Sequence, residues 1–190
     1  MSLIYGDDFK NSLTISSTYA FQELFSNCVN LVSAENLILP ATTLADWCYL
    51  KMFKGCTSLT TAPELPATTL VKNCYYGMFE GCTSLTTAEL PATTLADYCY
   101  AYMFSDCTSL TAAPELPATK LADYCYYQMF QGCSSLTTAP ELPAATLVKW
   151  CYNRMFKGCS LLKTAPALPA TTLADYCYGS MFEGCTSLTT

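Results

Sequence analysis

The residues best suited to chemistry in this 190-residue chain are its 13 cysteines. Thiolates can bind zinc or form disulfides, and both depend on how the cysteines are spaced. Most of them form pairs separated by eight residues: Cys48/Cys56, Cys74/Cys82, Cys99/Cys107, Cys125/Cys133, Cys151/Cys159 and Cys177/Cys185. Zinc sites favour much shorter spacings, and here the ligands would be spread along the chain, so we expect no metal site.

The remaining cysteine, Cys28, lies in a degenerate first unit in which Ala20 takes the partner position. Equivalent cysteines of stacked units could come within about 5 Å, which a disulfide tolerates. Pairing neighbours would, however, draw the units together unevenly. We therefore predict buried free thiols that serve as small apolar side chains.

The chain contains no histidine. This excludes nucleophile systems that use a histidine base and every histidine-containing metal site. The sequence also lacks a serine–lysine pair at a motif spacing, a phosphate-binding glycine loop and a nucleotide fingerprint. We expect no enzyme, no catalytic or metal-binding residues and no cofactor.

The cysteine pairs mark an internal repeat, which is the feature that determines the fold. The first cysteines of successive pairs lie 26, 25, 26, 26 and 26 residues apart. The unit that begins at Cys125 reads CYYQMFQGCSSLTTAPELPAATLVKW. Counted from the first cysteine, Cys, Tyr, Met, Phe and Cys recur at offsets 0, 1, 4, 5 and 8 in almost every unit.

These recurring offsets predict a short amphipathic helix in each unit. At about 100° per residue they share one face about 140° wide, while the variable offsets 2, 3 and 6 lie opposite. The start of the helix is predicted at aspartate N-caps, Asp46, Asp97, Asp123 and Asp175. Its end is predicted at glycines suited to a left-handed conformation, Gly55, Gly81, Gly132, Gly158 and Gly184.

The second half of each unit predicts a short extended segment. Ser-Leu-Thr-Thr-Ala leads into Pro-Glu-Leu-Pro, with apolar residues directed inward and prolines interrupting the strand. Neither a two-turn helix nor a five-residue strand is stable alone, so the units must bury their apolar faces against one another. The prediction is an α/β repeat: a curved, right-handed solenoid of about six 26-residue units, each with a short strand and a two-turn helix.

The segments MFKGCTSL (52–59), MFEGCTSL (78–85), MFQGCSSL (129–136) and ELPATTL (64–70, 89–95) resemble the BspA-like leucine-rich repeats of bacterial cell-surface proteins. The resemblance covers residues 20–190 and implies a leucine-rich-repeat solenoid. It also implies a secreted or cell-surface protein that binds host proteins or other cells. The family has no catalytic residues to carry over.

Two sets of side chains are candidates for a binding surface. The first occupies one position of the repeat, which should place its members about 5 Å apart in a row: Glu64, Glu89, Glu115 and Glu141. Such a row could attract a basic partner or hold calcium, or it could simply be solvated. The second set lies on the variable outer face and could contact a partner or be scattered surface residues: Tyr76, Tyr102 and Tyr127.

The charge of the chain restricts its partners. A net charge of −6 and a pI of about 4.5 argue against nucleic acid and anionic membranes, which require basic patches. No apolar run is long enough to cross a membrane. The first residues lack the basic segment and apolar run of a signal peptide, so an extracellular location rests on the resemblance.

Residues 1–19 are polar enough to be an N-terminal cap, and residues 20–190 form the predicted solenoid, whose last unit is incomplete. The uncapped C-terminal unit could support self-association. We predict a non-catalytic surface or secreted adhesion module that binds a protein or glycan. The alternatives are a structural spacer or self-assembling array within a larger surface protein, and an intracellular protein-interaction module.

Overall fold

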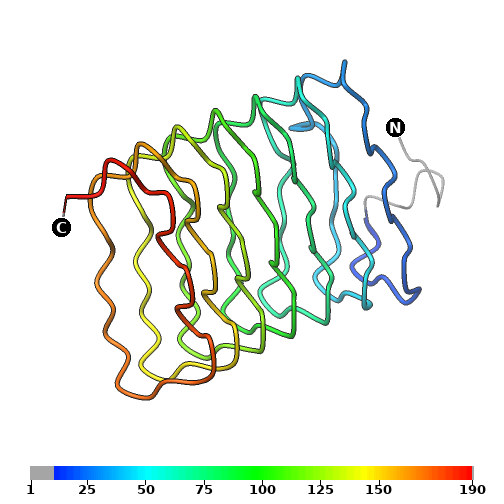
Figure 1. Cartoon of the computed structure of the whole chain (residues 1–190). Coiled ribbons are helices and arrows are strands. Elements are labelled where there is room, and N and C mark those ends of the chain that lie inside the picture. Colours follow the sequence, from blue (N-terminus) through cyan, green and yellow to red (C-terminus); the bar gives the residue numbers. More distant parts are fainter. Residues whose placement is uncertain (1–10, 190) are drawn as a thin grey trace.

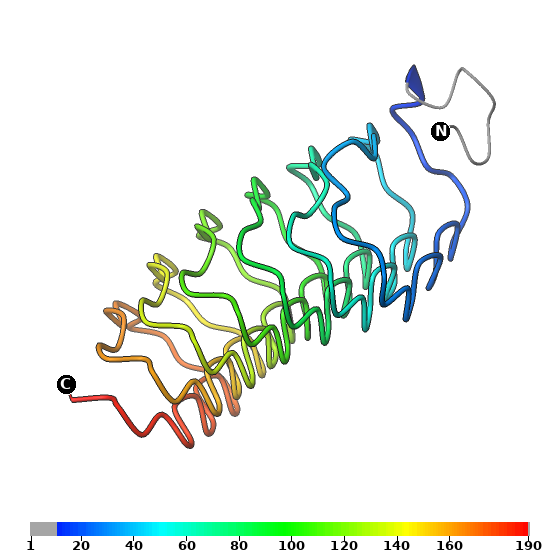
Figure 2. The ribbon, with the colours of Figure 1, turned by 90° about the horizontal axis from the view of Figure 1, so that it is seen from above.

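The computed structural model describes residues 11–189, which form a row of stacked coils (Figure 1). Viewed from above, successive coils lie side by side along one axis (Figure 2). Residues 1–10 of the predicted N-terminal cap, and Thr190 of the last unit, lie outside the described residues. The predicted repeat solenoid is confirmed as an architecture, but its local structure differs from the prediction.

The two-turn helix predicted for each unit is wrong. Within residues 11–189, helical geometry occurs only at Asn11, in a 3₁₀ conformation. The segment from 45 to 56 is instead a series of overlapping β-turns, in which every second N–H donates to the carbonyl three residues earlier. Two such bonds are Leu50 N–H to Trp47 O at 3.2 Å and Cys56 N–H to Phe53 O at 3.1 Å. We call this segment of each unit the turn series.

Every fourth residue of the turn series has a positive φ. In one unit these are Trp47 at 61°, Lys51 at 51° and Gly55 at 71°. In a type II turn the third of the four residues has a positive φ and the second does not. Type II turns therefore alternate along the segment with turns that contain no positive φ at their two central residues. The non-glycine residues at such sites are not β-branched, in keeping with the steric limits on left-handed conformations. The structural period is therefore four residues, not 3.6.

The other N–H groups of the turn series join neighbouring units. Tyr49 N–H donates to Cys74 O at 3.0 Å, and Phe53 N–H donates to Met78 O at 2.9 Å. The bonds alternate strictly: odd offsets donate to the following unit, and even offsets donate within their own unit. An α-helix would use nearly all of these groups internally and could not join the units in this way.

The spacing of the units explains why the turn series replaces a helix. The stacked rings of Tyr49 and Tyr75 have centroids 5.6 Å apart, and those of Phe53 and Phe79 lie 5.5 Å apart. Packed helices need about 8–10 Å between their axes. A column of helices therefore does not fit at this spacing, whereas a chain of turns that bonds to its neighbours does.

The predicted N-caps are also wrong, because there is no helix for these aspartates to cap. The Asp123 carboxylate instead accepts a hydrogen bond from the Lys149 N–H of the next unit, at 3.1 Å. Asp97 accepts the Asn73 N–H through its backbone carbonyl, at 3.0 Å. These aspartates thus lie at contacts between units.

The predicted strand is reduced to isolated parallel bridges. One column of bridges lies before the Pro-Glu-Leu-Pro step and includes Ser33–Thr61–Thr87 and Ala112–Thr138–Thr164. A second column lies after it and includes Thr69–Thr94–Lys120 and Thr146–Thr172. The prolines between the columns have no N–H to donate, which keeps a continuous strand from forming.

The core lies between the turn series and the extended side, and each inward offset forms a column along the solenoid. The Cys, Tyr, Met, Phe and Cys of the turn series are buried in the central units, together with the leucine at offset 11. Tyrosine rings stack from Tyr49 to Tyr178 with centroids 5.6–6.0 Å apart. Phenylalanine rings stack from Phe25 to Phe182 with centroids 5.3–5.8 Å apart. The buried columns predicted from the repeat are confirmed.

The glycine column brings the backbones of adjacent units close together. Gly132 has φ +72°, and a Cβ built on it would collide with the carboxylate of Asp106, the residue that replaces glycine in the preceding unit. Gly81 has φ +73°, but its added Cβ would come no closer than 3.8 Å to the backbone of Gly55. The same backbone conformation thus occurs in two different environments.

Candidate binding surfaces

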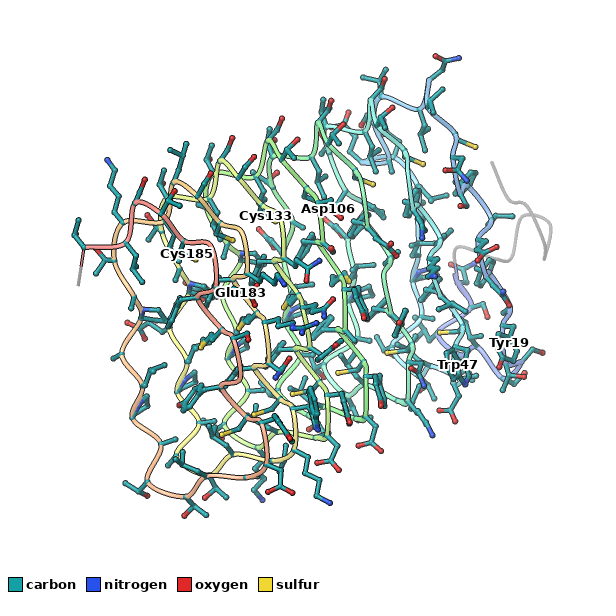
Figure 3. The ribbon with its side chains drawn as sticks, viewed as in Figure 1. Tyr19, Trp47, Asp106, Cys133, Glu183 and Cys185 are labelled. Atoms are coloured by element: carbon teal, nitrogen blue, oxygen red, sulfur yellow. The ribbon has the colours of Figure 1, made fainter. Side chains whose placement is uncertain are left out.

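The cysteines are buried free thiols, with two exceptions: Cys28 is exposed and Cys185 is half-buried. From Cys56 to Cys185, each thiol at offset 8 donates a hydrogen bond to a phenylalanine carbonyl of the preceding unit, as from Cys133 Sγ to Phe104 O at 3.0 Å. Cys133 and Cys185 both belong to this column (Figure 3). Burial raises the pKa of Cys82 and of Cys133 to about 12. The buried thiols of this column are therefore neutral and unreactive at neutral pH.

The described part of the chain offers no obvious metal site. Among residues 11–189 no group of three or more Cys, Asp or Glu side chains is arranged to hold an ion. The same residues include no helix long and apolar enough to cross a membrane.

The four glutamates predicted to form a row are brought together by the fold. All four are exposed, and they line shallow grooves between successive Pro-Glu-Leu-Pro steps. Glu64 and Glu89 border a groove of about 500 Å³, and Glu115 and Glu141 border another of about 450 Å³. Prolines such as Pro114 and Pro140 form the apolar part of the walls. Whether this row binds a basic partner or calcium remains a prediction.

The three outer tyrosines are also brought together, and they are half-buried rather than fully exposed. The ring centroids of Tyr76 and Tyr102 are 5.3 Å apart, and those of Tyr102 and Tyr127 are 5.4 Å apart. Burial raises the pKa of Tyr102, with the neighbouring Tyr127 adding to the effect. The three rings form one patch that crosses successive units.

A second aromatic column was missed by the sequence reasoning. It lies at offset −1, the residue before each first cysteine, and its rings stack with centroids 4.4 Å apart for Tyr98–Tyr124, 5.6 Å for Tyr124–Trp150 and 4.4 Å for Trp150–Tyr176. Tyr127 contacts both Tyr124 and Trp150 edge-on, at 5.7 and 6.1 Å. The signal was present in the sequence: five of the six pairs are preceded by Tyr or Trp.

The two sets together form a continuous outer aromatic surface, defined here as Tyr76, Tyr98, Tyr102, Tyr124, Tyr127, Trp150 and Tyr176. The offset −1 column continues at the N-terminal end as Tyr19 and Trp47, whose ring centroids are 5.7 Å apart (Figure 3). Between Trp47 and Tyr98 it is interrupted, because Asn73 occupies the position.

Comparison with known proteins identifies the class. A model of the BspA type leucine rich repeat region matches the chain over residues 22–163 and 115–190, with six copies of the repeat. The chain therefore belongs to the BspA-type leucine-rich-repeat family. The matching model describes a repeat of the kind found in protein-interaction modules and indicates no catalytic family.

Solved structures support the same fold. The T. pallidum leucine rich repeat protein (TpLRR) is 21% identical, with a TM-score of 0.54, over 93% of this chain and 72% of that one. A leucine-rich repeat protein from Bacteroides ovatus is 20% identical, with a TM-score of 0.51, over 88% of this chain and 38% of that one. No curated protein sequence matches the chain.

Proposed function

We propose that this chain is a non-catalytic binding module, secreted or at the cell surface, which contacts a protein or glycan through its outer aromatic surface. The observation that carries the proposal is the continuity of this surface across successive units. Its rings lie outside the core columns, and Tyr176 is 64% exposed. Tyr and Trp are the residues that contribute most often to protein interfaces, because they combine a large apolar area with a polar group.

The surface is also well suited to binding because it is pre-ordered. Each ring of the offset −1 column is stacked on its neighbours, so little side-chain entropy remains to be lost on association. The surface or secreted location is supported by the family resemblance alone. The row of Glu64, Glu89, Glu115 and Glu141 would form a second contact, suited to a basic partner.

The uninterrupted core columns favour one other candidate, a structural spacer. A spacer needs only regular stacking, and the phenylalanine column runs from Phe25 to Phe182 without a break. It does not, however, account for aromatic rings on the outside of the turn series. End-to-end self-association of the units would be a property of such an array.

The test is adhesion of the purified chain to immobilised extracellular-matrix proteins and to a glycan array. The test variant carries Tyr127→Ser, Trp150→Ser and Tyr176→Ser, and the control carries Thr→Ser at three exposed residues outside both proposed contacts, Thr68, Thr93 and Thr119. We expect the test variant to lose at least about 30-fold in affinity, since removal of an interface anchor costs about 2 kcal/mol or more. Equal binding by the parent chain and the test variant, or the absence of any binding by the parent chain, would refute the proposal.

A further inference from the structure

The interruption in the offset −1 column leaves a notch that is one aromatic ring wide. Further along the column, Tyr124 fills the space between Tyr98 and Trp150, with ring centroids 4.4 and 5.6 Å from theirs. The equivalent space between Trp47 and Tyr98 belongs to Asn73, whose side chain has no ring. A cavity of about 440 Å³ lies there, within the roughly 300–1,000 Å³ typical of small-ligand pockets.

We infer that this notch receives a tyrosine side chain of the partner, with a carboxylate close to its ring. The inference deepens the proposed function and rests on it, because it names the chemistry recognised at one point of the aromatic surface. The inserted ring would lie between Trp47 and Tyr98 and restore the column. Stacking between two faces is the arrangement that Tyr124 already adopts further along.

The floor of the notch contains a polar group without a partner. Asn73 is 2% exposed, and its Nδ2 has no hydrogen-bond partner among the described residues. Such a buried donor costs about 1–3 kcal/mol, and native structures rarely leave one unpaired. The nitrogen is covered in the free chain, so a ring oxygen such as that of a phenol would accept from it after a small shift of the Asn73 side chain.

The rim of the notch determines the charge of its occupant. Lys51 and Lys72 both line the cavity, whereas Glu23 is its only acidic lining residue. This excess of positive charge is local, because the chain as a whole has 15 acidic and 9 basic residues. The Lys51 ammonium lies 5.8 Å from the centre of the Tyr76 ring and can turn toward a carboxylate at the mouth of the notch. A neutral sugar would stack on the rings but would gain nothing from the lysines.

The experiment uses tryptophan fluorescence at the notch itself. The chain has two tryptophans, so Trp150→Phe leaves Trp47 as the single reporter while keeping a ring in the column. The probes are N-acetyl-L-tyrosine, N-acetyl-L-tyrosinamide and methyl glucoside. We expect saturable binding of N-acetyl-L-tyrosine, affinity at least about threefold weaker for the amide, and no saturation with the glucoside.

Two substitutions at residue 73 in this background separate filling of the notch from loss of the fold. Asn73→Tyr fills it with a ring that other units carry at this offset, and should weaken N-acetyl-L-tyrosine binding at least tenfold. Asn73→Gly keeps the notch open and tolerates the positive φ of 54°. It removes only the Nδ2 donor, so it should weaken binding less than Asn73→Tyr does. Circular dichroism of both variants verifies the fold. Unchanged binding after Asn73→Tyr, tighter binding of the glucoside, or no saturation with N-acetyl-L-tyrosine would overturn the inference.

The two proposals fail separately. The adhesion variant alters Tyr127, Trp150 and Tyr176, none of which lines the notch. Binding of N-acetyl-L-tyrosine to a chain that shows no adhesion would leave the notch established and refute the larger proposal. Adhesion by a chain that does not bind N-acetyl-L-tyrosine would support the adhesion proposal and refute the inference about the notch.

Discussion

Replacing Gly132 by alanine should destabilise the protein more than the same change at Gly81. Both glycines have nearly the same φ, +72° and +73°, so both variants incur the cost of a side chain in the left-handed region, about 1–2 kcal/mol. Only at Gly132 would the new Cβ also collide with the Asp106 carboxylate. Moving that carboxylate off its rotamer, away from its 3.3 Å hydrogen bond with the Ser105 hydroxyl, adds about 0.5–1.5 kcal/mol.

The assay is urea unfolding of the two variants, followed by circular dichroism, with the free energy of unfolding taken from the midpoint and slope. Gly132→Ala should lose about 1.5–3.5 kcal/mol in all, and Gly81→Ala about 1–2 kcal/mol. Adding Asp106→Gly to Gly132→Ala should recover the difference, as a coupling of about 0.5–1.5 kcal/mol in a double-mutant cycle. Equal losses at the two glycines, or zero coupling, would show that the close approach between units does not contribute.

Three further predictions concern the core. In the folded protein Cys28 should be the only thiol that reacts rapidly with a disulfide reagent, and all 13 should react after unfolding in guanidinium. Because burial raises the pKa of Cys82 and Cys133 from 9.0 to about 12, their stabilising contribution is fully present below about pH 9 and is lost as the pH rises toward 12. The double variant Cys82→Ala/Cys133→Ala lacks both thiols. Between about pH 9 and pH 12 its free energy of unfolding should therefore fall less steeply with pH than that of the parent chain, by about 2.7 kcal/mol per pH unit. An equal slope in the two proteins would contradict the raised pKa values. Tyr126→Phe should leave stability unchanged or raise it by about 1 kcal/mol in thermal melts, because the Tyr126 hydroxyl is buried without a partner among the described residues; a clear loss would contradict this.

The repeat and its buried columns could be predicted from the sequence, because identical residues at a fixed period must occupy equivalent places. The turn series could not be predicted by the helical argument, although the distinguishing signal was present. Offsets 0, 4 and 8 coincide at a period of four but drift by about 40° at each step on a helix. On a helix these three offsets would spread over about 80° of the surface, whereas in the turn series they form the same edge of the core.

The candidate surfaces were predicted in part for a related reason. Glu64 and Glu89 lie at one offset, so any stacking of the units would align them. Tyr76 and Tyr102 lie at different offsets, 2 and 3, and their contact depends on the detailed path of the turn series. The aromatic column at offset −1 was not predicted, because on a helix this offset falls outside the face that the recurring residues share.

The alternation of hydrogen bonds in the turn series gives each unit two kinds of amide. The Met52 N–H bonds to Tyr49 O within its own unit, so its protection from hydrogen exchange reports local turn formation. The Phe53 N–H bonds to Met78 O, so its protection reports whether the following unit is docked. Adjacent residues thus separate the intrinsic stability of a unit from the nearest-neighbour coupling, the two quantities that determine cooperativity in a linear array. Exchange measured along the chain would show how far the loss of order at one unit spreads to the next.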